Sequence, residues 1–221
     1  MKNAGATLKA SIEECAGRLR NQSPLGQVVR AGQLTPRALA LYLTSLRHLF
    51  EHSYPHLQLA AERAAACGLP ELAEYLVQRS HEERGHDAWA NSDLAKLPDS
   101  LTKDVQPAAA IVRLIELQRL LIAKHPLCFV AYFIWAEYLT VLLGDEWLEA
   151  LAKYGYDRSK LSAVAKHLDA DREHAAVGFT ELDRLWHGEP ELEALVESVE
   201  RAHRVFEEFC DEICVEARRA A

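Results

Sequence analysis

The chain is poor in residues that interrupt helices, since only 10 glycines and 8 prolines occur among its 221 residues. Regular alternation of apolar and polar residues, which marks a half-buried strand, is also missing. Alanine, leucine and glutamate are abundant, and these residues favour helices. The sequence therefore predicts an all-α protein. Because the composition does not shift partway along, we expect a single domain over residues 1–221.

Positive charge is scarce as well. The chain has 25 Lys and Arg residues against 33 Asp and Glu residues, which gives a formal net charge of -8. Its basic residues are scattered among acidic ones. Proteins that coat nucleic acids usually present a basic face, so this distribution argues against a nucleic-acid partner.

Cysteine pairs and export signals are lacking too. The first residues, MKNAGATLKASIEE, contain no apolar core of the kind a secretory signal needs. An odd number of cysteines without a CxxC pair argues against a disulfide framework or a zinc knuckle. We therefore expect a cytoplasmic protein with reduced cysteines at Cys15, Cys67, Cys128, Cys210 and Cys214.

One apolar run, residues 127–143, approaches the composition of a membrane span. It is slightly short, carries Glu137 near its middle and has no flanking basic clusters. We interpret it as a helix at the centre of the fold and expect no membrane partner.

Prolines, glycines and capping residues divide the chain into helical segments. Thr35 followed by Pro36 marks one start, and Pro55 should kink or divide the helix that follows. Ser159 is expected to cap a later helix. The predicted helices cover about residues 7–19, 37–67, 71–97, 107–124, 127–144, 146–153, 159–186 and 190 to the C-terminus.

The strongest motif is HLDADREH, which contains His167, Asp171 and His174. At about 100° per residue, their spacing of i, i+4 and i+7 places all three on one face of a helix. Three side chains able to bind a metal therefore point the same way.

An ExxH pair, Glu83 and His86, lies in an earlier predicted helix, and Glu82 is a second candidate because it stands four residues before His86. Asp171 and His174 repeat the acid-x-x-His spacing. Bundles that bind pairs of iron or manganese ions use two such half-sites and further carboxylates from other helices.

Glu137 is the obvious further carboxylate, since it is the only charge in its apolar helix. A buried carboxylate must be protonated, paired with a base or bound to a cation. Carboxylates and imidazoles without thiolates favour iron, with manganese next. A cluster of His48, Glu51 and His52 could line the pocket or add a ligand, but we interpret it as a solvated face.

Together these residues resemble the haem-oxygenase-like di-iron oxidases and oxygenases, which share the fold of haem oxygenase, thiaminase II and pyrroloquinoline-quinone synthase. The resemblance covers nearly the whole chain and implies a bundle of about seven or eight helices. In some relatives the first Glu stands seven residues before the His, and here that position is Arg79. The implied ligands are Glu83, His86, Glu137, His167, Asp171 and His174.

The resemblance implies an O2-dependent redox enzyme with two iron ions, or manganese as the alternative metal, that oxidises an amino acid, an amine or a fatty acid. A metal-independent enzyme similar to thiaminase II or the quinone synthase is one alternative, and Cys128 is then the candidate nucleophile. A non-catalytic metal-binding helical protein is another. We expect a homodimer formed through the N- and C-terminal helices.

Overall fold

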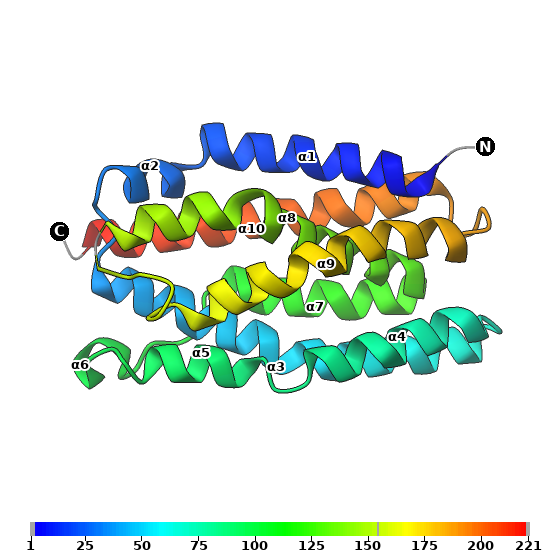
Figure 1. Cartoon of the computed structure of the whole chain (residues 1–221), viewed down its shortest axis with the longest axis horizontal. Coiled ribbons are helices and arrows are strands. Elements are labelled where there is room, and N and C mark those ends of the chain that lie inside the picture. The colour runs from blue at the N-terminus through cyan, green and yellow to red at the C-terminus, as the bar shows by residue number, and fades with distance from the viewer. Residues whose placement is uncertain (1–2, 154, 220–221) are drawn as a thin grey trace.

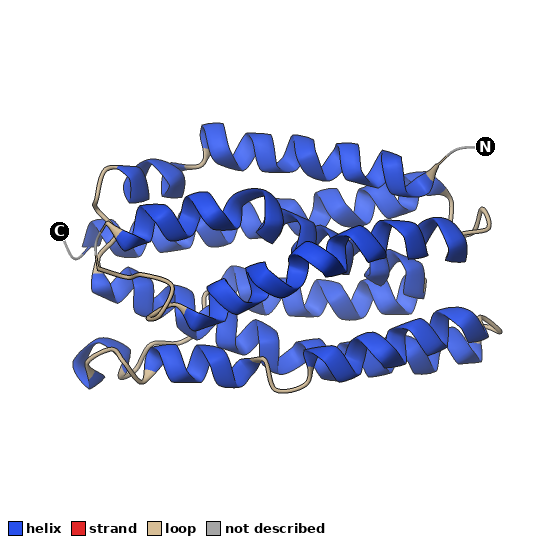
Figure 2. Ribbon diagram, viewed as in Figure 1, coloured by secondary structure: helices blue, strands red, loops and turns tan. Residues whose placement is uncertain are grey.

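The computed structural model describes residues 3–153 and 155–219, and their regular secondary structure is helical throughout, without a strand (Figure 2). The prediction of an all-α protein is confirmed. Ten helices cover these residues: α1 (Ala4–Gln22), α2 (Pro24–Arg30), α3 (Pro36–Ala66), α4 (Pro70–Glu83), α5 (Asp87–Leu94), α6 (Asp99–Thr102), α7 (Ala109–Lys124), α8 (Pro126–Ala152), α9 (Ser162–Leu185) and α10 (Leu192–Arg219).

Three of these helices are short, since α2, α5 and α6 have only 7, 8 and 4 residues. The other seven are long, in agreement with the expected seven or eight helices. The long helices run roughly along one direction, and α9 crosses the front of the bundle obliquely (Figure 1). The start of α1 and the end of α10 lie at opposite ends of the bundle.

Helix α8 lies at the centre, as its composition predicts. It packs against α1, α7, α9 and α10 and is buried around most of its circumference. By length and composition it could cross a membrane, but 67% of its most apolar stretch is buried inside the protein, as in the core helix of a soluble fold. It continues to Ala152, eight residues beyond Gly144, where a break was predicted.

Two glycines let α8 and α9 approach closely. A Cβ atom at Gly144 of α8 would lie 3.0 Å from Leu168 Cδ1 of α9. A Cβ atom at Gly178 of α9 would likewise lie 3.0 Å from Ile134 Cγ1 of α8. This close contact brings the buried carboxylate of Glu137 to the surface of α9.

The predicted helix over residues 71–97 is wrong in its middle, because the chain breaks between α4 and α5. Gly85 adopts a φ of 87° there, in the left-handed region that glycine enters without a steric penalty. Of the two outcomes expected at Pro55, a kink or a division, the division does not occur, since α3 continues through this residue.

The predicted cap of α9, Ser159, is wrong as well, because α9 begins at Ser162 and Ser159 hydrogen-bonds Asp157 instead. The buried carboxylate of Asp93 from α5 takes this role. It accepts hydrogen bonds from the Ala163 amide at 2.7 Å and the Ser162 hydroxyl at 2.7 Å. A carboxylate at a helix N-terminus satisfies free amides and interacts favourably with the helix dipole, so Asp93 ties α9 to α5.

Candidate metal centre

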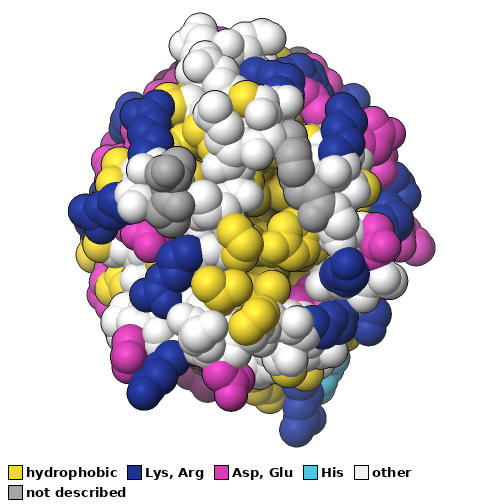
Figure 3. All heavy atoms as spheres, turned by 90° about the vertical axis from the view of Figure 1, so that its left-hand side faces the viewer, with side chains coloured by type: hydrophobic (Ala, Val, Ile, Leu, Met, Phe, Trp, Pro, Cys, Tyr) yellow, Lys and Arg dark blue, Asp and Glu magenta, His cyan; other side chains and the backbone are white. Residues whose placement is uncertain are grey.

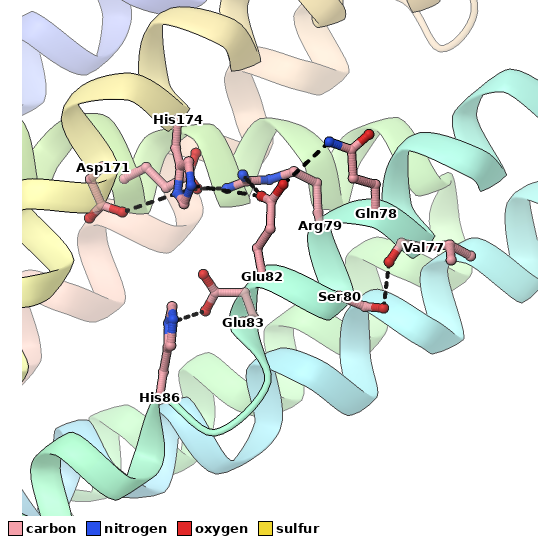
Figure 4. A network of polar contacts seen from close by, with 10 residues as sticks. Val77, Gln78, Arg79, Ser80, Glu82, Glu83, His86, Asp171 and His174 are labelled. Atoms are coloured by element: carbon pink, nitrogen blue, oxygen red, sulfur yellow. Dashed lines mark hydrogen bonds and ion pairs between the residues drawn. The ribbon is translucent and has the colours of Figure 1, made fainter.

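Side chains from α4, α8, α9 and the break before α5 converge beside the central helix. Figure 4 shows Arg79 and Glu82 of α4 directed toward His174 of α9, while Glu83 is directed toward His86. Two overlapping groups of three residues are suited to hold a metal ion, and Glu83 belongs to both.

The first group consists of Glu83, His86 and His167, all buried. One ligand atom from each lies within 4.8 Å of the others, and Glu83 Oε2 is 3.3 Å from His86 Nδ1. Two ligands of one ion, each at about 2.1 Å from it, are at most about 4.2 Å apart. The three side chains are therefore close to the spacing that one ion requires.

His167 is oriented as metal-binding histidines usually are. Its Nδ1 lies 2.7 Å from the carbonyl oxygen of Ala163, to which it donates, and this bond leaves Nε2 with a free lone pair. Nε2 is buried and has no hydrogen-bond partner among the described residues. Burial lowers the pKa of His167 to about 4, so the ring is neutral at pH 7. This unpaired nitrogen fits a metal ion.

Aromatic side chains fix the two imidazoles of this group. The ring of Phe50 stacks on His167 with centroids 4.1 Å apart, and the ring of Trp89 stacks on His86 at 4.0 Å. The break at Gly85 places His86 just before α5, and Asp93 of α5 holds the start of α9. The contact between α5 and α9 therefore helps to position both His86 and His167.

The second group consists of Glu83, Glu137 and His174, again with ligand atoms within 4.8 Å of one another. His174 Nδ1 is 3.5 Å from Glu137 Oε1. Here a protein cation is already present, because the buried Arg79 guanidinium forms ion pairs with both Glu137 and Glu82. Although burial opposes the charged form, the Glu137 carboxylate raises the pKa of Arg79.

Asp171 is buried on α9 but belongs to neither group. Its Oδ1 lies 3.9 Å from His174 Nδ1. Burial, together with the nearby carboxylates of Glu137 and Glu83, raises the pKa of Asp171 to about 9. The structure therefore brings five of the six predicted ligands into the two groups and leaves Asp171 beside them.

The structure also places the other candidate ligands from the sequence, Glu82 and the cluster of His48, Glu51 and His52. Glu82 is 34% exposed and pairs with Arg79, whereas Glu83 is buried in both groups, so the geometry favours Glu83 as the ligand. His48, Glu51 and His52 lie outside both groups, and the Glu51 side chain is 42% exposed. No role for Arg79 or Asp93 was predicted from the sequence. Arg79 shares a face of α4 with the buried Leu72 and Leu76, whereas α5 is short and has no clear apolar face that would have singled out Asp93.

A cavity of about 260 Å³ adjoins the site, and its lining is mainly apolar. Glu83, Glu137, His167 and Asp171 line its polar part. It also reaches α2, at the end of the bundle seen in Figure 3, where apolar side chains gather and charged ones surround them. Cys128 does not line this cavity; it is buried near α10, and burial raises the pKa of its thiol.

No protein-family model and no curated protein sequence matches the chain. Solved structures do. A domain of unknown function with a haem-oxygenase-like fold from Shewanella denitrificans OS217 is 21% identical, with a TM-score of 0.84 over 94% of this chain and 90% of that one.

A CADD-like protein of unknown function from Nostoc punctiforme PCC 73102 is similar in two structures. They are 16% and 14% identical to this chain, with TM-scores of 0.71 and 0.68. The matches cover 96% and 97% of this chain, and 99% and 97% of theirs. The chain therefore has the haem-oxygenase-like fold that its motifs predicted.

Proposed function

We propose that the protein is a non-haem iron oxidoreductase that uses O2 to oxidise a small molecule with an apolar body. The observation that carries this proposal is the buried group of Glu83, His86 and His167, in which His86 Nδ1 lies 3.3 Å from Glu83 Oε2 and His167 Nε2 has no hydrogen-bond partner among the described residues. Two imidazoles and one carboxylate, with coordination positions left open, are the donor set of many ferrous oxygenases.

Different residues of the chain bind the metal and the substrate. Glu83 and His167 hold the metal at the wall of the cavity, since both side chains line it. Apolar side chains such as Phe50, Phe133 and Leu139 line the rest, so they exclude water and bind the apolar part of a substrate. Ferrous iron held here would bind O2 and pass electrons to it, and oxidation of the substrate would return them to the iron, so that the net electrons for O2 reduction come from the substrate.

The substrate is best sought among fatty acids and apolar amines or amino acids, because the lining of the cavity is mainly apolar. A nucleophilic mechanism through Cys128 has no support in the geometry, because its thiol lies outside the cavity and is kept protonated by burial.

The test is to load metal-free protein with Fe²⁺ under anaerobic conditions, then add air-saturated buffer with a panel of fatty acids and apolar amines. We expect a substrate to accelerate O2 uptake and to appear as an oxidised product by mass spectrometry, with no such effect in Glu83→Gln. Equal O2 uptake with and without every compound would contradict an enzymatic role and support a non-catalytic metal-binding protein. Product formation that survives chelation would instead support the metal-independent enzyme.

A further inference from the structure

We propose that the site holds a single metal ion, bound by Glu83, His86 and His167, and that the guanidinium of Arg79 replaces a second ion. The inference rests on the proposed function, because it states how many ions that same site holds. It departs from the pair of ions that the resemblance to the di-iron oxidases implies, and the disagreement comes from the side chains around Glu137.

The position of a second ion is taken by a protein cation. Arg79 Nη2 donates to Glu137 Oε1, and Arg79 Nη1 donates to Glu82 Oε2. These contacts lie on the side of Glu137 that faces His174, whose Nδ1 is 3.5 Å from the same Oε1. One of the two carboxylate oxygens of Glu137, Oε1, is therefore already bound by a protein cation.

Arg79 is also held firmly. Its side chain is 6% exposed, its Cζ lies 5.2 Å from the ring centroid of Phe133, and carboxylates bind it on two sides. An arginine does not lose its proton in a protein, so its charge persists. A divalent ion bound to Glu137 would lie next to this fixed positive charge and be repelled by it.

The first group contains no comparable cation. Within the described residues the only basic side chain in ion-pair distance of Glu83 is His86, itself a proposed ligand. The Nε2 of His167 points to no protein donor or acceptor in that part of the chain. Glu83 therefore has no arginine or lysine partner among these residues, whereas Glu137 is already paired with Arg79, although Glu137 Oε2 and His174 Nδ1 also lack a hydrogen-bond partner there.

The experiment uses Mn²⁺ as the probe, which can be handled in air. Bound metal per chain is counted after gel filtration, and the electron paramagnetic resonance spectrum is recorded. We expect one Mn²⁺ per native chain, with the resolved hyperfine lines of an isolated ion. Arg79→Glu and Arg79→Gln are expected to bind two ions and give the broadened spectrum of a coupled pair. Arg84→Gln, which alters an arginine outside the ion pairs of the site, is the matched control and should bind one.

Two Mn²⁺ ions in the native chain would overturn the inference and leave the proposed function standing. One ion in both the native chain and a folded Arg79→Gln variant would show that Arg79 does not exclude the second, which also overturns it. If Arg79→Glu fails to fold, Arg79→Gln decides. No binding of Mn²⁺, Fe²⁺ or Zn²⁺ would overturn the inference and the proposed function together. One Mn²⁺ per chain without O2 turnover of the iron form would contradict the proposed function alone.

Discussion

The two halves of the candidate metal centre share Glu83 but differ in how their charges are balanced. Around His86 and His167 no arginine or lysine forms an ion pair with Glu83 in the described part of the chain, and His167 Nε2 is buried without a hydrogen-bond partner there. Around Glu137 and His174 the guanidinium of Arg79 already supplies a positive charge. The two halves therefore offer similar ligand types in different electrostatic surroundings, and on our proposal the neighbouring cation decides which half binds a metal.

The largest effect is expected from Glu83→Gln, which removes the carboxylate that the two halves share. Metal affinity should fall by more than the roughly 100-fold that loss of an outer hydrogen-bond partner causes, because a direct ligand is lost. Isothermal titration with Mn²⁺ measures this change. The matched control is Glu82→Gln on the same helix, and comparable losses in both variants would contradict the assignment of Glu83.

The pairing in the second half can be broken with Glu137→Leu. Removing one partner of a buried ion pair typically costs about 3–5 kcal/mol, and we expect about 3 kcal/mol here because Glu82 still contacts Arg79. Urea unfolding of the metal-free protein gives the free energy. The double variant Glu137→Leu, Arg79→Met should recover most of the loss. A double variant as unstable as the single one would show that the pair is not the cause.

A smaller effect is expected where α5 holds α9, and it should fall on the first half of the site. Asp93→Ala removes the cap of α9 and should lower the free energy of unfolding by about 1–2 kcal/mol. It should also weaken Mn²⁺ binding, because His167 stands one turn after the capped amide of Ala163. Asp157→Ala, which changes an exposed carboxylate in the preceding loop, is the control. An unchanged metal affinity in Asp93→Ala would show that the Asp93 cap does not position His167 for metal binding.

Much of the fold was predictable because its boundaries carry strong signals. Thr35 and Pro36 begin α3 as expected, with the Thr35 hydroxyl accepting from the Ala38 amide. The apolar circumference of α8 predicted its central place. The break at Gly85 was not predictable, since a single glycine in a polar helix is often tolerated and only tertiary contacts decide whether the chain turns there.

The sequence predicted which side chains come together, but not how their charges are balanced. Helical spacing placed His167 and His174 on one face, and the lone charge of Glu137 marked the central helix as a contributor. Spacing does not show whether an arginine such as Arg79 turns inward, because arginines usually extend their charged ends to solvent. Its inward position follows from the carboxylates of Glu82 and Glu137, which only the packed fold brings together.

The most direct test compares His167→Ala with His174→Ala, since the two residues lie on the same face of α9 in different halves of the site. Mn²⁺ affinity and stoichiometry are measured by isothermal titration, with circular dichroism to verify that both variants remain helical. The proposed ligand set predicts that His167→Ala loses metal binding, whereas His174→Ala still binds one ion with an affinity within about tenfold of the native chain, as expected for a residue outside that set. Loss of binding in His174→Ala, or retention in His167→Ala, would contradict it.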